Sequence, residues 1–280
     1  MIAVVYSGSK NACWKIWQEG TAMIETHTAS VNPCFNDHKQ LLQVLSKNIT
    51  LIHNAENIRK IYVFAAGASA KEKQQELTST LEQFFVNGKI KVKDDVYGAA
   101  IAACHDKTGI VGILGSGANC AYYNGKKPEK NNYGLGYILA DEGSANYFGK
   151  MLLKNFLEGK MPEDLKMKIE AQYNLDRPGI LERVYRKPQA QTYLASFLDF
   201  YLDNRDHTYI QQLLAQGFDK YIQSYIIPTL EKHPEEEIHF VGSVAGAFQD
   251  QLREVASKYN INIVSVTKEP IHNILNYYTN

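Results

Sequence analysis

The chain has 280 residues, and its 30 Lys and Arg are balanced by 30 Asp and Glu, so the formal net charge is zero. This balance argues against binding to nucleic acid or to an anionic membrane through bulk charge. The length suffices for one large domain or two medium domains, and a hydrophobic content of 45% is typical of a globular protein. No apolar run approaches the roughly 20 residues of a membrane span, and the first residues lack the pattern of a signal peptide.

The four cysteines are scattered and form no CxxC pair: Cys13, Cys34, Cys104 and Cys120. We therefore expect neither a disulfide framework nor a zinc site, and a reducing cytoplasm is the simplest location. The eight histidines form no HxxH or HxxxH set. The sequence thus predicts no metal site built by the protein itself.

Predicted strands alternate with predicted helices up to residue 104, which indicates an α/β layout. Apolar runs on both sides of an SGSKN turn predict two strands, and apolar residues at helical spacing predict the helices. In chain order the predicted elements are strands at 2–6 and 12–17, a strand within 21–30, a helix at 38–49, a strand at 58–69, a helix at 71–85, a strand at 89–95 and a helix at 96–104.

The opening pattern returns at residues 109–125 as GIVGILGSGANCAYYNG, again a strand, a glycine-rich turn and a strand. This internal echo indicates two related α/β halves, with a boundary near Lys107–Thr108. The second half continues with a Gly/Asp-rich segment at 134–150, several helical segments, strands at 237–243 and 261–266, and a terminal helix at 270–278.

The two glycine- and serine-rich turns are candidate phosphate sites. Backbone N–H groups of such turns form concavities that bind anions, and glycine permits a close approach of the ligand. A single turn of this kind is more often an ordinary hairpin, but a pair at equivalent positions of two similar halves favours phosphate binding. Neither G-x-G-x-x-G nor a Walker-type G-x-x-x-x-G-K is present, so dinucleotide-binding and P-loop folds have no support.

Five stretches occur in the order of the motifs of the sugar kinase/actin/Hsp70 superfamily: SGSKNACW, DDVYGAAIAA, ILGSGANC, GLGYILADEGSA and FVGSVAGAF. Over nearly its whole length the chain resembles the N-acetylglucosamine kinases and the related BadF/BadG-type ATPases of that superfamily. The resemblance implies an α/β fold of two actin-like (ribonuclease H-like) lobes, each a mixed five-stranded sheet flanked by helices, with a cleft between them. It implies one lobe at 1–107 with a C-terminal helix at about 267–280, and another at 108–266 with a helical insertion.

The resemblance also implies ATP and Mg²⁺ as cofactors, with the metal arriving together with ATP. In the family, an Asp before the first turn helps to hold Mg²⁺, but here that position is Tyr6. Lys10 replaces a usual Thr, and Cys13 replaces a second common Asp. Lys10 could place an ammonium group near the phosphates, or it could be a solvated turn lysine.

The implied nucleotide contacts fall on three motifs. Phosphates would be held at Ser7, Gly8, Ser9, Lys10, Gly115, Ser116 and Gly117. Adenosine would lie near Gly242, Ser243 and Ala245. A tight strand–helix junction is the alternative reading of the last motif, because it requires the same glycine.

Asp95 matches the catalytic aspartate of the family, which accepts the proton of the sugar hydroxyl. The alternative role for Asp95 is a helix N-cap, and Asp94 is its immediate neighbour. The resemblance places the sugar at Asn32, Ala118, Asn119, Gly134, Leu135 and Asp141. Asn32 could instead belong to an ordinary Asn-Pro turn, and Asp141 to a charged helix N-terminus.

The leading interpretation is ATP-dependent phosphorylation of a hexose or N-acetylhexosamine by in-line transfer, with Asp95 as the base. The partners would be a sugar and ATP, with a homodimer as one assembly. Because the first phosphate loop lacks its Asp, a weakly active or non-catalytic nucleotide- or sugar-binding relative is the alternative. A third interpretation, an ATPase that activates a dehydratase through an iron–sulfur cluster, is disfavoured because the cysteines lie in or beside the motifs above.

Overall fold

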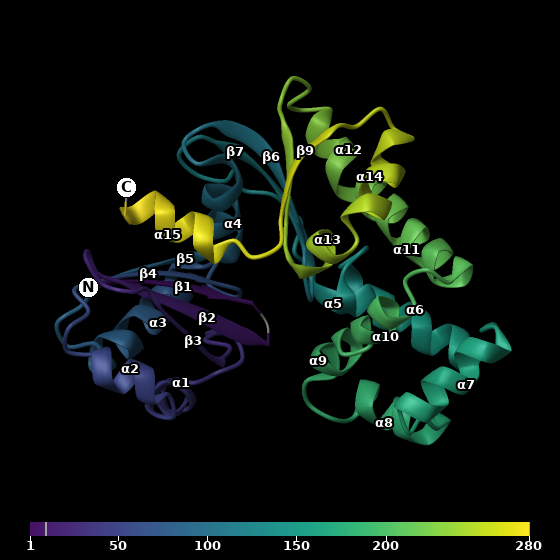
Figure 1. The fold of residues 1–280 in the computed structure, drawn as a ribbon, viewed down its shortest axis with the longest axis horizontal. Helices are drawn as coiled ribbons and strands as arrows, with labels where there is room; N and C mark the ends of the chain where they lie inside the picture. Colours follow the sequence, from purple (N-terminus) through teal and green to yellow (C-terminus); the bar gives the residue numbers. More distant parts are fainter. Residues whose placement is uncertain (9, 280) are drawn as a thin grey trace. The chain divides into compact units, whose positions relative to one another are not determined.

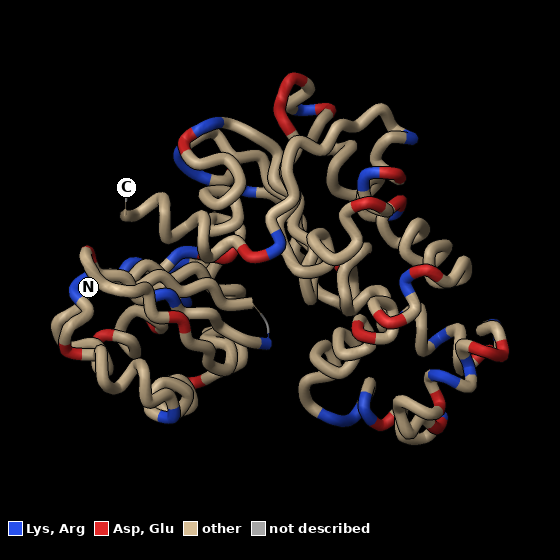
Figure 2. Tube along the Cα trace, viewed as in Figure 1, with Lys and Arg blue, Asp and Glu red and all other residues tan. Residues whose placement is uncertain are grey.

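The computed structural model describes residues 1–8 and 10–279, and the chain divides into two compact units. Unit 1 comprises Met1–Gly109, Tyr123–Glu129 and Glu269–Asn280, and unit 2 comprises Ile110–Tyr122 and Lys130–Lys268. Figure 1 shows the elements of each unit, and Figure 2 shows Lys and Arg interspersed with Asp and Glu in both. None of the described helices combines the length and apolar character that a membrane crossing requires.

Unit 1 is built on a mixed five-stranded sheet with the spatial order β3-β2-β1-β4-β5. Its strands are β1 (Ile2–Ser7), β2 (Asn11–Trp17), β3 (Ile24–Ala29), β4 (Lys60–Ala65) and β5 (Lys89–Asp94). The pairs β1–β2 and β2–β3 are antiparallel, whereas β1–β4 and β4–β5 are parallel. The hairpin and the crossovers of this sheet follow the strand–helix alternation of the sequence.

Alternation along β1 gives the sheet of unit 1 two buried faces. Ala3 and Val5 belong to one apolar cluster and Val4 to another, because neighbouring residues of a strand point to opposite faces. The covering helices are α1 (His38–Ser46), α2 (Ile49–Asn54) and α3 (Lys71–Phe84) on one face, and α4 (Asp95–Cys104) and α15 (Ile271–Thr279) on the other. Both faces therefore supply packing that fixes the strand ends.

Unit 2 carries a mixed four-stranded sheet with the order β7-β6-β8-β9. Its strands are β6 (Thr108–Leu114), β7 (Ala118–Asn124), β8 (Ile238–Val241) and β9 (Ile263–Thr267). The expected fifth strand is not formed by the residues that follow β7. Gly134, Gly136 and Gly143 all have positive φ there, and this conformation interrupts an extended strand.

The helices of unit 2 share one large apolar core with its sheet. Phe148, Phe218, Tyr221 and Phe240 are fully buried within it. The helices are α5 (Gly136–Leu139), α6 (Ala145–Leu157), α7 (Glu163–Gln172), α8 (Arg177–Tyr185), α9 (Ala190–Ala195), α10 (Leu198–Asp203), α11 (Thr208–Tyr221), the π-helix η1 (Ile222–Ile226), α12 (Ile227–Leu230), α13 (Ser243–Ala247) and α14 (Gln249–Ser257). Among the described residues, eight of the α-helices, α5 to α12, lie between β7 and β8 in the chain.

Candidate active site

The parallel strands of unit 1 bring three chain segments to one edge of the sheet. Ser7 at the end of β1 pairs with Ala65 of β4, and Ala65 pairs with Asp94 of β5. Carboxyl ends of parallel strands are the usual place for ligands in open α/β sheets. The register thus puts the first glycine-rich turn and the Asp94-Asp95 pair, far apart in sequence, at the same sheet edge.

The hydroxyl of Ser7 is committed to the packing of this edge. Ser7 is fully buried, and its Oγ accepts a hydrogen bond from the N–H of Val31 at 3.1 Å. The hydroxyls of Ser7 and Ser30 lie 3.2 Å apart, and Ser30 Oγ also donates to the carbonyl of Gly8 at 2.6 Å. The side chain of Ser7 therefore fixes the turn to the segment after β3, and its hydroxyl is already used within the protein.

The turn itself is open on its outer side. The N–H of Gly8 donates to the carbonyl of Asn11 at 3.1 Å, which closes the hairpin, and nothing lies within 4 Å of the position that a Cβ of Gly8 would take. Lys10 is exposed, so its ammonium group is solvated. Ser9, the third residue expected to bind phosphate here, lies outside the described residues.

Asp94 and Asp95 have different roles at the start of α4. Asp94 is the N-cap, and its Oδ1 accepts from the N–H of Tyr97 at 2.8 Å. The N-cap role that the sequence left open for Asp95 is therefore filled by Asp94. Asp95 is the first residue of the helix. Burial, followed by the nearby charge of Asp94, raises the pKa of Asp95 to about 6. A carboxylate with that pKa is ionised at neutral pH and is still basic enough to accept a proton.

Tyr6 places a phenol beside this carboxylate pair. Its hydroxyl donates to the backbone carbonyl of Asp95 at 3.5 Å, across 89 residues of sequence. Burial, and then the charges of Asp95 and Asp94, raise the pKa of Tyr6 well above its ordinary value, so the phenol stays neutral. At the position where the family resemblance implies a carboxylate, this chain therefore has a neutral hydrogen-bond donor.

Asn32 is buried and its side chain takes part in a local turn. Its Oδ1 accepts from the N–H of Cys34 at 2.8 Å, as the Asn-Pro turn interpretation predicts. Gly67, two residues beyond β4, has φ +82°, and a Cβ there would lie 2.1 Å from Asn32 Oδ1. Close packing against Gly67 therefore holds this carboxamide near the ends of β1 and β4, and the sequence pattern did not single out Gly67.

The second turn, in unit 2, is held by its carbonyl groups. The N–H of Gly115 donates to the carbonyl of Gly117 at 3.0 Å. The carbonyl of Gly115 accepts from the N–H of Ala145, and that of Ser116 accepts from the N–H of Asn146, at 2.9 and 3.1 Å. The turn is thereby attached to the first turn of α6, whose N–H groups have no partner within the helix.

Asp141 also supports this turn through its carboxylate. It is buried with φ +69°, and its Oδ1 accepts from the N–H of Ala118 at 3.0 Å. Its Oδ2 accepts from the amide of Asn146 at 3.4 Å. The N-cap of α6 is Ser144, so Asp141 is not a charge at a helix N-terminus. Burial raises the pKa of Asp141, although the hydrogen bond from Ala118 opposes the shift.

Asn119 and Gly134 lie against each other. A Cβ on Gly134, whose φ is +74°, would lie 2.9 Å from Asn119 Nδ2, so only glycine fits there. The hydroxyl of Tyr221 donates to the carbonyl of Asn119 at 2.7 Å and holds that end of β7. Leu135 is exposed, so its side chain contributes little to this packing.

The π-helix η1 contributes a residue that the motifs did not indicate. The hydroxyl of its Tyr225 donates to Glu142 Oε2 at 2.9 Å and accepts from the N–H of Asp141 at 3.3 Å. Single π-helical turns within α-helices are frequent at functional sites because they redirect side chains. The long sequence distance from residue 141 to residue 225 left no signal for this contact.

The junction between β8 and α13 touches the second turn within unit 2. Gly242 has φ +125°, and a Cβ there would lie 2.3 Å from the carbonyl oxygen of Leu114, which precedes Gly115. Ser243 begins α13, and Ala245 is buried in it. The motifs expected for adenosine and for phosphate are therefore neighbours in space, and the tight-junction reading accounts for the same glycine.

The chain is similar to solved structures of sugar kinases. A candidate N-acetylglucosamine kinase from Porphyromonas gingivalis is 32% identical, covers 99% of this chain and 98% of its own, and superposes with a TM-score of 0.92. A candidate N-acetylglucosamine kinase from Chromobacterium violaceum is 15% identical with a TM-score of 0.65, and the two chains are covered over 99% and 98%. A ROK family glucokinase from Streptomyces griseus, solved with glucose and AMPPNP, is 11% identical with a TM-score of 0.59 and 98% coverage of both chains.

No protein-family model and no curated protein matches the chain. The identity and full coverage of the Porphyromonas gingivalis protein nevertheless show the family: the chain belongs to the N-acetylglucosamine kinase-like sugar kinases of the actin-like ATPase superfamily. The expected fold class is confirmed, with four strands rather than five in the second sheet.

Proposed function

We propose that the protein is an ATP-dependent kinase of a hexose or N-acetylhexosamine. The observation that carries this proposal is the strand register that brings the first turn and Asp95 to one edge of the sheet of unit 1. The similarity to candidate N-acetylglucosamine kinases and to a glucokinase solved with glucose and AMPPNP supports both substrates. We also propose the division that the family resemblance implies, with one lobe at 1–107 plus about 267–280 and another at 108–266.

In the proposed reaction, a sugar hydroxyl attacks the γ-phosphorus of ATP in line with the leaving oxygen. A new P–O bond forms as the bond from the γ-phosphorus to the bridging oxygen breaks, which gives ADP and a sugar phosphate. Asp95 accepts the hydroxyl proton, and its pKa of about 6 suits this role. Backbone groups of the two glycine-rich turns hold the phosphates, and the Gly242 motif contacts adenosine.

The residues fit Mg²⁺ that arrives with ATP rather than a metal held at the first turn. Tyr6 carries a neutral phenol there, which is a poor ligand for a hard cation. Asp94 and Asp95 are the carboxylates at this edge, and one Asp94 oxygen already caps α4. When bound, Mg²⁺ neutralises charge on the triphosphate, while the chain aligns the sugar and accepts the proton.

The proposal is tested by ADP release with ATP, Mg²⁺ and a panel containing N-acetylglucosamine, N-acetylmannosamine and glucose. Asp95→Asn should lower kcat by about 100-fold or more, the usual loss for a general base. Asp94→Asn is the matched control, because Asn caps a helix as well as Asp does. It should stay within about tenfold of the wild type, and an equal loss in both variants would contradict the assignment of Asp95.

Tyr6 favours one alternative, a relative that binds nucleotide or sugar without turnover. Loss of a carboxylate that helps to place a metal can remove several kcal/mol of transition-state stabilisation. Calorimetric binding of ATP or a sugar, combined with no sugar-dependent ADP release, would favour this alternative over the kinase.

A further inference from the structure

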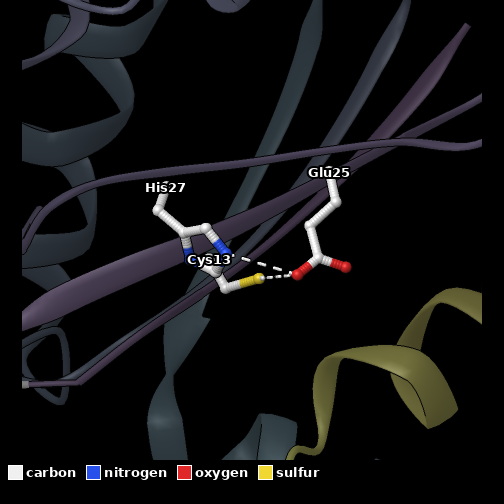
Figure 3. Close-up of side chains that lie close together, drawn as sticks. All are labelled: Cys13, Glu25 and His27. Atoms are coloured by element: carbon white, nitrogen blue, oxygen red, sulfur yellow. Dashed lines mark hydrogen bonds and ion pairs between the residues drawn. The ribbon is translucent and has the colours of Figure 1, made fainter.

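A second group of reactive side chains lies on the hairpin that follows the first turn. Cys13 of β2 is paired in register with His27 of β3, and Glu25 lies two residues before His27. Residues that are opposite, or two apart, point to the same face of a sheet. Figure 3 shows the thiol, the carboxylate and the imidazole converging there.

The three ligand atoms are already close to the spacing of a metal site. Glu25 Oε1 lies 3.3 Å from His27 Nε2 and 3.9 Å from Cys13 Sγ, and all three atoms lie within 4.8 Å of one another. Tetrahedral Zn²⁺ binds N and O at about 2.0–2.2 Å and S at about 2.3 Å, which places ligand atoms roughly 3.2–3.8 Å apart. Small side-chain rotations of two exposed residues and one half-buried residue would complete the geometry.

Lys15 fixes the carboxylate in this arrangement. It is fully buried, and its Nζ donates to Glu25 Oε2 at 2.7 Å and lies 2.9 Å from His272 Nδ1. The other carboxylate oxygen, Oε1, is thereby turned toward the thiol and the imidazole. Outer hydrogen bonds of this kind orient metal ligands and change affinity by about 10–100-fold.

We propose that Cys13, Glu25 and His27 bind one divalent ion of the Zn²⁺ class, with water in the fourth position. A thiolate and a carboxylate supply two negative charges against the two of the ion and the one of Lys15, and the imidazole binds as a neutral ligand. A sulfur and a nitrogen ligand do not suit Mg²⁺, so this site is distinct from the metal that accompanies ATP. The ion would fasten β2 to β3 directly after the first phosphate turn.

The proposal departs from the expectation that the chain builds no metal site of its own. That expectation rested on the spacing of histidines and cysteines along the sequence. The ligands here come from two strands, and their separation of 12 or 14 residues matches no metal motif. Only the register of the hairpin brings them together.

Cobalt substitution tests the proposal, with any affinity tag removed from the full chain. Co²⁺ bound by a thiolate gives a near-ultraviolet charge-transfer band, which should saturate at one ion per chain and be displaced by Zn²⁺ but not by Mg²⁺. Cys13→Ser should abolish the band, and His27→Gln and Glu25→Gln should weaken Co²⁺ binding about tenfold or more. Cys34→Ser is the matched control, because Cys34 is also a free thiol but lies outside the hairpin, and it should keep the band.

A second readout, thermal stability, depends neither on kinase activity nor on the charge-transfer band. Zn²⁺ should raise the thermal midpoint of the wild type and of Cys34→Ser, but not of Cys13→Ser. Circular dichroism of the metal-free variants establishes that each is folded. The proposal is overturned if no charge-transfer band forms with millimolar Co²⁺, or if the band survives in Cys13→Ser. Either result would leave the kinase proposal intact, and an inactive protein that shows the band would leave the metal site intact.

Discussion

Tyr6 is the side chain at which this protein departs most from the pattern it resembles. The position is filled by a half-buried phenol whose hydroxyl contacts the carbonyl of Asp95. The phenol adds no negative charge next to Asp94 and Asp95, whereas a carboxylate would. Since like charges raise a carboxyl pKa, Tyr6 keeps the pKa of Asp95 lower than a third carboxylate would allow.

Restoring the carboxylate should therefore move the pH dependence of the kinase. Because the base must be ionised, activity falls as the pH drops through the pKa of Asp95, about 6 in this protein. Tyr6→Asp adds a negative charge and should shift the acidic limb of the kcat/KM profile to higher pH. Tyr6→Phe, which removes only the hydroxyl, should shift it far less, and an acidic limb that moves to lower pH in Tyr6→Asp would contradict this account.

Ionised Asp95 should also lower the free energy of unfolding. Its pKa is raised from 3.8 to about 6, so the ionised form is disfavoured in the folded state. Folding stability is lost as the pH rises from about 4 to about 6 and does not return above it. At pH 8, Asp95→Asn should be more stable by up to about 3 kcal/mol, and by less to the extent that water screens the group.

Urea unfolding at two pH values measures this effect. Near pH 3.5 the aspartate is largely protonated in both states, so the wild type and Asp95→Asn should differ little there. A variant that is equally stabilised at both pH values would show that packing, rather than charge, is responsible.

Among the helices, η1 links the helical part of unit 2 to the Asp141 loop. Tyr225 reaches both Glu142 and the backbone of Asp141 from this π-helical turn. Tyr221, four residues earlier, stacks on Tyr225 with ring centroids 4.7 Å apart and holds the carbonyl of Asn119. The junction of α11 and η1 thus supports Asn119 and Asp141, two of the proposed sugar contacts of this unit.

Tyr225→Phe should loosen the Asp141 loop without leaving a cavity in the core, because the ring is kept. Loss of the hydroxyl leaves the N–H of Asp141 without that acceptor, which costs about 1–3 kcal/mol. We expect a higher KM for the sugar and a smaller change in the KM for ATP. Tyr259→Phe is a control of the same chemistry, because its hydroxyl bonds Asp219, which lies outside the proposed sugar contacts. A selective rise in the KM for ATP would contradict the assignment.

For the chain as a whole, the important feature is that each unit has its own apolar core. The sheet of unit 1 is covered by two clusters, and unit 2 has one large cluster of its own. Compact units with separate cores can open independently of one another. The order β2-β1-β4-β5 in one unit corresponds to β7-β6-β8-β9 in the other, as the repeated turn motif predicts.

Core truncations should therefore act within their own unit. Leu77→Ala in unit 1 and Phe218→Ala in unit 2 remove fully buried side chains, each at a cost of about 2–5 kcal/mol. Hydrogen exchange measured by mass spectrometry should rise mainly in the mutated unit. Equal acceleration across both units would show that the chain unfolds as a single cooperative body.

The sequence alone predicted most elements because their signals are local. Helical spacing predicted α3 within one residue, and the Gly-rich turns predicted both hairpins. The helix predicted at 38–49 instead ends at Ser46, and Asn48 caps a separate α2 that the periodicity did not distinguish. The order of the motifs also indicated the family, because turn glycines and strand-end aspartates can be recognised directly in the sequence.

Tertiary structure alone decided which side chains meet. Strand register placed Ser7 level with Asp94, put Cys13 opposite His27, and brought Tyr6 against Asp95. In the folded chain, Asp94 is the N-cap of α4, and Asp141 stabilises the second turn by accepting a hydrogen bond from Ala118. The physical reason is that propensity and periodicity act over a few residues, whereas burial, pKa shifts and ligand geometry depend on groups that only folding brings within a few ångströms.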